Sequence, residues 1–223
     1  MKVGIIGFGS MGSMIARKLL EHNVISQSEL TCANRTLAKM DGFKKQYPDC
    51  TVTDNNKFAA KADVVFVCIR PAELKDVLCG IAAAVSKDTL VVSLNGSVMF
   101  SQLESVLAEK TRIAKVIPSV NAEVDYSVTS VCYNKYVEPK DKANLEALLK
   151  SFGTVTEVAE NELGMASELT SLLFQPRYML LPLHFRNLRI TDWQKQRKRS
   201  SEVCRPPWAF PEKEPEMTHL FAV

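Results

Sequence analysis

Hydrophobic and polar positions form two alternating kinds of segment along most of the chain. Short apolar runs rich in Val and Ile predict strands that a parallel sheet buries on both faces, and apolar residues at three-and-four spacing predict helices between them. The predicted strands are 3–6, 29–33, 64–69, 90–94, 113–117, 127–132 and 155–158. The predicted helices are 10–21, 36–46, 71–85, 99–108, 139–152 and 161–173. This alternation predicts a doubly wound α/β fold with a parallel sheet over residues 1 to about 171.

A glycine series occupies the first predicted strand-to-helix junction. The series consists of Gly7, Phe8, Gly9, Ser10, Met11 and Gly12, which fit the pattern GxGxxG. The first glycine permits a tight turn, the second lets the backbone approach a pyrophosphate, and the third lets the helix pack closely. The helix N-terminus then faces the phosphates. The pattern predicts a Rossmann-type dinucleotide site, and the alternative is a glycine-rich turn without a ligand.

The composition of the chain changes after Ser171. All nine glycines lie at or before Gly164, whereas six of the ten prolines and both tryptophans lie after Ser171. Residues 172–223 contain nine Lys and Arg against five Asp and Glu, while residues 1–171 contain 19 against 20, so the formal net charge of +3 belongs to this end. We expect a nucleotide-binding domain over 1–158, the start of a linking helix over 159–173, and a poorly ordered, irregular or partly helical tail over 174–223.

The remaining composition narrows the class of protein. The basic run 194–199 could bind nucleic acid or direct nuclear import, but a solvated stretch is favoured because no nucleic-acid motif accompanies it. The chain shows neither a long apolar run nor a secretory signal, so we expect a cytoplasmic protein with a small-molecule substrate and no nucleic-acid or membrane partner. Six cysteines lie at positions 32, 50, 68, 79, 132 and 204 without a CxxC pair, which favours reduced thiols over disulfides or a metal site.

The residues after the second predicted strand indicate which dinucleotide binds. An NAD site usually carries Asp or Glu there, which accepts a hydrogen bond from the ribose 2′-hydroxyl. This chain has Asn34, Arg35 and Thr36 instead. A guanidinium can pair with a 2′-phosphate and neutral side chains can add hydrogen bonds, so NADP is favoured over NAD. Arg35 could also be a surface charge at the turn, or stack on adenine without setting a preference.

Two later junctions should also approach the cofactor, because they follow strands at the carboxyl edge of the sheet. The first consists of Cys68, Ile69, Arg70 and Pro71, and the second of Asn95, Gly96 and Ser97. Proline suits the first turn of the next helix, and the second junction could pass near the nicotinamide ribose. Both sets are also ordinary turn residues, so a role as simple connections stays open.

An ordered series of segments resembles the nucleotide-binding domain of the pyrroline-5-carboxylate reductases: GIIGFGSMG, ANRT, FVCIRPAELKDVL, SLNGSV, RIAKVIPSVNAEV and FGTVTEVAENEL. The resemblance implies reduction of the C=N bond of 1-pyrroline-5-carboxylate to proline, with hydride from NAD(P)H, and thus a place in proline biosynthesis. It also implies a helical C-terminal domain through which family members dimerise. By the same resemblance, the pyrophosphate would be held by Gly7, Gly9, Met11 and Gly12, the adenosine end by Asn34 and Arg35, and the ribose by Arg70 and Pro71.

The chain departs from the family in two places. Where the family commonly has Met-Pro-Asn-Thr-Pro, residues 117–121 read IPSVN, so Ser119 replaces the asparagine expected near the nicotinamide. Ser119 and Asn121 are the catalytic candidates, and no residue is marked as a general acid. The segment 172–223 does not resemble the helical domain, so we expect a shifted reading frame or a premature end there, and a monomer or a weak dimer.

Three functions stay open at this level. The first is an NADP-dependent imine reductase of the pyrroline-5-carboxylate type. The second is another NADP-dependent oxidoreductase built on the same nucleotide domain, which the altered 117–121 loop favours. The third is a non-catalytic module that binds NADP.

Overall fold

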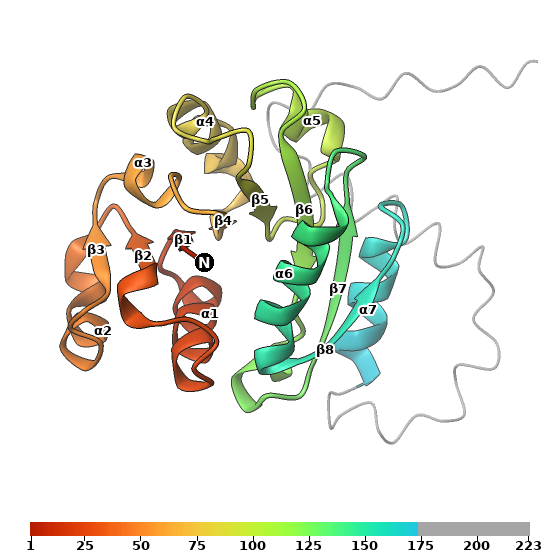
Figure 1. The fold of residues 1–223 in the computed structure, drawn as a ribbon. Helices are drawn as coiled ribbons and strands as arrows, with labels where there is room; N and C mark the ends of the chain where they lie inside the picture. The colour runs from red at the N-terminus through yellow and green to blue at the C-terminus, as the bar shows by residue number, and fades with distance from the viewer. Residues whose placement is uncertain (174–223) are drawn as a thin grey trace, which may run out of the picture.

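The structure is a computed structural model that describes residues 1–173. Expectations for the tail 174–223, including those for Cys204 and the basic run 194–199, concern residues outside this part. Eight strands form one sheet in the order β3-β2-β1-β4-β5-β6-β7-β8 (Figure 1). The strands are β1 (Val3–Ile6), β2 (Leu30–Ala33), β3 (Thr51–Thr53), β4 (Val64–Val67), β5 (Leu90–Ser93), β6 (Arg112–Ile117), β7 (Ser127–Tyr133) and β8 (Gly153–Glu157).

Helices connect most of the strands. The α-helices are α1 (Ser10–Glu21), α2 (Asp41–Gln46), α3 (Asn56–Ala59), α4 (Pro71–Ile81), α5 (Phe100–Glu104), α6 (Pro139–Leu149) and α7 (Leu163–Leu173). The 3₁₀ helices are η1 (Gln27–Glu29), η2 (Leu37–Met40), η3 (Val120–Val124) and η4 (Lys150–Phe152). The doubly wound α/β fold predicted from the sequence is therefore confirmed, and each predicted strand and helix has a counterpart.

One pair of strands corrects the expectation of a parallel sheet. β6 and β7 are antiparallel, with Ile117 opposite Ser130, whereas every other pair in the sheet is parallel. The physical reason is the connection between them, since only nine residues separate Ile117 from Ser127. A parallel return needs a crossover of about a dozen residues or more.

Four short elements, β3, η1, α3 and η3, were absent from the predicted set. β3 extends the sheet at its edge, with Thr31 of β2 opposite Thr51. α3 and η3 fill connections between strands. β3 is three residues long and none of them is buried, so it gave no apolar run that a sequence pattern could reveal.

The two faces of the sheet bury separate hydrophobic clusters. Alternate residues of β1 illustrate this, because Ile5 belongs to the cluster that includes residues of α1 and α6, whereas Ile6 belongs to the cluster that includes residues of α3, α4 and α5. Side chains of a strand point alternately to its two faces, so both faces of the central strands are covered. A sheet buried on both sides is a rigid platform, and it fixes where the loops at the strand ends lie.

The segment before α7 is held to the sheet by a partly buried ion pair. Lys115 of β6 is fully buried, and its Nζ lies 3.0 Å from Oε1 of Glu160. The same carboxylate oxygen accepts a hydrogen bond from the backbone N–H of Phe100 at 2.7 Å. Because an unpaired charge in a protein interior is costly, this contact fixes the segment between β8 and α7 against β6 and α5.

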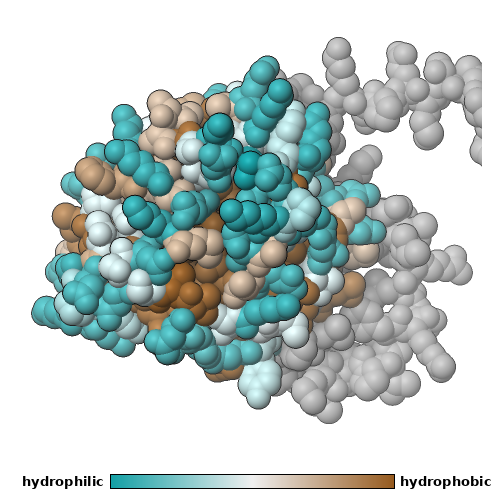
Figure 2. Space-filling model, in the orientation of Figure 1, coloured by the Kyte–Doolittle hydropathy of each residue, from teal (hydrophilic) through white to brown (hydrophobic). Residues whose placement is uncertain are grey.

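Most of the surface seen in Figure 2 is hydrophilic, with hydrophobic atoms gathered near the centre of the view. The most exposed large hydrophobic side chains of the described residues are Phe58, Val124 and Tyr126. Among residues 1–173, no helix has both the length and the apolar character needed to cross a membrane.

Candidate functional site

Packing within the protein explains two of the three glycines after β1. Gly7 has a φ of +94°, and a Cβ there would lie 2.5 Å from the carbonyl oxygen of Cys68. Its backbone N–H donates to the carbonyl of Ala33 at 2.8 Å. A Cβ on Gly12 would lie 2.0 Å from the carbonyl oxygen of Gly7. The tight turn and the close packing of the helix therefore both require glycine, as the pattern predicted.

Gly9 has no such explanation in the protein. A Cβ on Gly9 would meet no atom within 4 Å, and the residue is exposed. It is the N-cap of α1, without a side-chain cap hydrogen bond and without an acidic residue in the first turn. The first N–H groups of a helix have no intrahelical acceptor and attract anions. The open space beside Gly9 is thus a cradle that a Cβ would narrow, and the donors around it fit a pyrophosphate.

The other three residues of the glycine series divide between core and surface. Phe8 is buried, and its ring packs edge-on against Phe43 of α2 with the centroids 5.0 Å apart. Ser10 is exposed and Met11 is half-buried in the first turn of α1. The side chain of Phe8 therefore belongs to the core, while Ser10 and Met11 lie where a ligand at the helix N-terminus would meet them.

Asn34 joins the loops that follow β1, β2 and β3. Its Oδ1 accepts from the N–H of Phe8 at 3.1 Å, and its Nδ2 donates to the carbonyl of Thr36 at 2.8 Å. Its own N–H donates to the carbonyl of Thr53 at 3.0 Å. The side chain predicted to touch the adenosine thus also fixes the glycine loop against the loop after β2.

Arg35 and Thr36 extend from the end of β2 into solvent. The Arg35 side chain is 89% exposed, and its Nη1 lies 3.9 Å from Oε1 of Glu73 in the first turn of α4. Thr36 is exposed as well. The guanidinium is therefore accessible from solvent to a phosphate. The sequence pattern missed Glu73, because the two residues belong to different strand-to-helix units.

The junction after β4 lies against the glycine loop, and the junction after β5 lies against the junction after β4. The carbonyl of Cys68 faces Gly7, and the carbonyl of Ile69 accepts from Nδ2 of the buried Asn95 at 2.9 Å. A Cβ on Gly96 would lie 2.5 Å from Cδ1 of Ile117, the end of β6. The ends of β1, β4, β5 and β6 therefore form one continuous edge, which confirms that the predicted junctions meet.

Individual side chains of these junctions differ in exposure. Arg70 is exposed at the N-cap of α4, and Pro71 is the first helical residue, as predicted. Burial raises the pKa of the Cys68 thiol to about 12, so this thiol stays protonated near neutral pH. Among the cysteines that the structure describes, none is paired, and Cys79 alone is exposed.

The loop after β6 places the two catalytic candidates differently. Ser119 is 3% exposed, and its Oγ accepts from the N–H of Val128 at 3.3 Å and donates to Oγ of Ser127 at 3.4 Å. Oγ of Ser127 in turn lies 3.0 Å from Oγ1 of Thr129. Asn121 is half-buried, and its carbonyl accepts from the N–H of Tyr126. The Ser119 hydroxyl is thus part of a closed network that shapes the loop.

The same loop is attached to α1 by ion pairs. Oδ1 of Asp125 lies 2.8 Å from Nζ of Lys18 and 3.1 Å from Nε2 of His22. Asp125 adopts the left-handed conformation with φ of 63°. The hydrogen bond from Lys18 holds the pKa of Asp125 below its ordinary value, and the same hydrogen bond raises the pKa of Lys18. No local sequence pattern pointed to this contact.

Comparisons with known proteins agree with this geometry. Residues 2–96 match the family model described as NADP oxidoreductase coenzyme F420-dependent. Pyrroline-5-carboxylate reductase 3 of Bacillus subtilis is 29% identical over 171 residues, which cover 76% of this chain and 62% of that protein. A solved pyrroline-5-carboxylate reductase from Coxiella burnetii has a TM-score of 0.74 at 25% identity, covering 91% of this chain and 73% of that one. Over this part, the chain is similar to the pyrroline-5-carboxylate reductases.

A second solved reductase shares the fold of this chain. The Plasmodium falciparum pyrroline carboxylate reductase, solved with NADP bound, has a TM-score of 0.69 at 22% identity, covering 92% of this chain and 74% of that one. The chain spans less than two thirds of the length of the Bacillus subtilis reductase. The sequence similarity to that reductase covers 76% of this chain.

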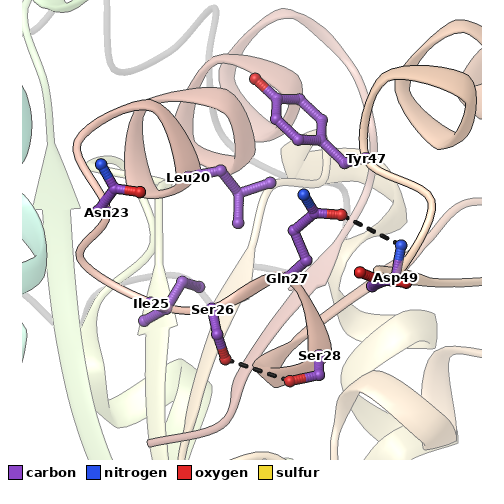
Figure 3. A pocket seen from close by; sticks show the side chains of 8 residues that line it. All are labelled: Leu20, Asn23, Ile25, Ser26, Gln27, Ser28, Tyr47 and Asp49. Atoms are coloured by element: carbon purple, nitrogen blue, oxygen red, sulfur yellow. Dashed lines mark hydrogen bonds between the residues drawn. The ribbon is translucent and has the colours of Figure 1, made fainter.

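Two cavities lie at the amino ends of the strands, on the opposite side of the sheet from the glycine loop. The first has a volume of about 400 Å³ and lies between the end of α1, the segment before β2 and the segment before β3 (Figure 3). There the side chain of Gln27 accepts from the N–H of Asp49 at 3.1 Å. The second, of about 540 Å³, is lined by Met1, Asp63 and Arg112 among others. Since α/β sheets bind ligands at the carboxyl ends of their strands, neither is the dinucleotide site.

Proposed function

We propose that this chain binds NADPH and forms the nucleotide-binding part of a pyrroline-5-carboxylate reductase, which reduces 1-pyrroline-5-carboxylate to proline. The observation that carries the proposal is the contrast among three glycines. Gly7 and Gly12 are required by packing, whereas Gly9 lies in open space at the N-terminus of α1. A ligand that approaches the backbone there explains a glycine that the protein itself does not need.

Different residues around the site would bind different parts of the cofactor. Backbone N–H groups from Gly9 to Met11 would bind the pyrophosphate, and Arg35 and Thr36 would bind a 2′-phosphate. Asn34 would keep these two loops at a fixed separation through its bonds to Phe8 and Thr36. When bound, NADPH supplies the hydride from its nicotinamide ring. The contribution of the described residues is to bind and orient that ring at the edge formed by the ends of β1, β4, β5 and β6.

A second function has a specific observation in its favour. Where the reductase family commonly has asparagine, this chain has Ser119, and that hydroxyl is buried in a network with Ser127 and Val128. A different substrate, reduced by the same NADPH-binding domain, would be consistent with this loop. A module that binds NADP without catalysis stays the third alternative.

The experiment that tests the proposal follows the loss of NADPH absorbance with pyrroline-5-carboxylate as substrate, with NADH in a parallel reaction. Turnover that prefers NADPH would support the reductase. Tight binding of NADP⁺ without turnover would instead favour another substrate or the non-catalytic module. The absence of both binding and turnover would overturn the proposal. A place in proline biosynthesis and a cytoplasmic location belong to the same proposal, and the family resemblance supports them.

A further inference from the structure

We infer that Glu73 weakens the preference of this site for NADP, because its carboxylate competes with a 2′-phosphate for Arg35. The inference rests on the proposed function, since it concerns how the domain distinguishes NADP from NAD. It gives a role to a residue of α4 that no sequence motif marks.

The contact between Glu73 and Arg35 is open and loose. Nη1 of Arg35 lies 3.9 Å from Oε1 of Glu73, and the two side chains are 89% and 54% exposed. This distance is too long for a good hydrogen bond, so Glu73 does not fix the orientation of the guanidinium. The two opposite charges still attract each other across it, and no other ion pair of Arg35 occurs within residues 1–173.

A 2′-phosphate bound by Arg35 would come close to the Glu73 carboxylate. Both groups are negative, so the carboxylate disfavours the phosphate at the place where Arg35 favours it. The ribose 2′-hydroxyl of NAD, in contrast, can donate a hydrogen bond to a carboxylate. Glu73 would thus supply from α4 the acidic group that the end of β2 lacks. The expected result is a weaker preference for NADP than Arg35 alone would give.

A purely structural role for Glu73 makes a different prediction. The residue lies in the first turn of α4, where an acidic side chain stabilises a helix through its dipole. In that case replacement would lower the stability of the fold and leave the ratio of NADP⁺ to NAD⁺ affinity unchanged. Asp76 is also exposed on α4, one turn further along, and offers a matched control.

The test titrates the full chain and its Glu73→Gln variant with NADP⁺ and with NAD⁺ at low salt. We expect Glu73→Gln to bind NADP⁺ about two- to fivefold more tightly, which is the size typical of an exposed ion pair, and NAD⁺ no more tightly than before. The gain should shrink at high salt, because exposed charges are screened. Asp76→Asn should change NADP⁺ affinity less than Glu73→Gln does.

Each other outcome is decisive. Unchanged or weaker NADP⁺ binding by Glu73→Gln, or an equal gain for both dinucleotides, would overturn the inference and leave the proposed function intact. Failure of the unaltered chain to bind either dinucleotide would overturn the proposed function and the inference together.

Discussion

The loop after β1 and the loop after β6 lie at the same edge of the sheet and are built in opposite ways. In the first, Gly9 lies in open space and caps α1 without a side-chain hydrogen bond. In the second, Ser119 is buried and bonded to its own loop, and Asp125 is paired with α1. Sequence patterns marked both loops as parts of the site. The comparison teaches that the first is left available for a ligand, whereas the second uses its polar groups to hold its shape.

The largest effect on stability is expected at Gly12, where α1 packs closely on the turn after β1. Gly12→Ala places a Cβ against the carbonyl oxygen of Gly7, at 2.0 Å in the present backbone. We expect a loss of about 3 kcal/mol or more in the free energy of unfolding, measured by denaturant titration. Gly80→Ala is the matched control, since Gly80 lies in α4 with open space around it and should become more stable by about 0.5–1 kcal/mol. Equal stability of the two variants would contradict the close packing of α1 on the turn.

Gly9→Ala separates binding from folding. The new methyl group meets no protein atom, so stability should change by less than about 1 kcal/mol. The methyl group narrows the space beside the helix N-terminus, so NADP⁺ affinity should fall about tenfold or more, a change of about 1.4 kcal/mol. Calorimetric titration measures the affinity, and a melting curve checks the fold. Wild-type affinity in this variant would remove the main support for a pyrophosphate site.

Ser119→Ala tests whether the second loop is only a support. The N–H of Val128 loses its acceptor, so the free energy of unfolding should fall by about 1–2 kcal/mol. Cofactor affinity should stay within about twofold, because the hydroxyl is not exposed at the edge. Ser97→Ala, at an exposed position, serves as the control. A large loss of turnover with unchanged stability would instead give Ser119 the catalytic role that its position in the sequence suggested.

The smallest effect is a dependence of stability on pH at Asp125. Its folded-state pKa lies below the ordinary 3.8, so the stability it contributes is present above pH 3.8 and is lost as the pH falls through the folded-state value. The pKa of Lys18 is raised above 10.5, so its contribution is present below pH 10.5 and is lost as the pH rises through the folded-state value. Denaturation midpoints of Asp125→Asn should vary less with pH at both ends. Asparagine tolerates the left-handed backbone at this position, so the variant tests the charge.

Sequence patterns located most of the fold because the signals are local. The apolar runs of β1 and β4 and the spacing of the glycines at 7, 9 and 12 can be read from consecutive residues, although Gly7 also packs against Cys68. Short polar elements such as β3 gave no such signal. The predicted direction of β7 was wrong, because the length of the connection before it, rather than the strand's own residues, decides that direction.

The sequence by itself determined the order of strands and helices and the glycine turn, because periodicity and backbone conformation are properties of consecutive residues. Only the tertiary structure decided which polar groups stay available to a ligand and which bond to the protein. It placed Glu73 beside Arg35, bonded Asn34 to Phe8, and enclosed Ser119. The first two contacts join residues from different strand-to-helix units, and the third joins the two ends of one loop. Whether a side chain meets a ligand or a neighbour depends on how these parts pack.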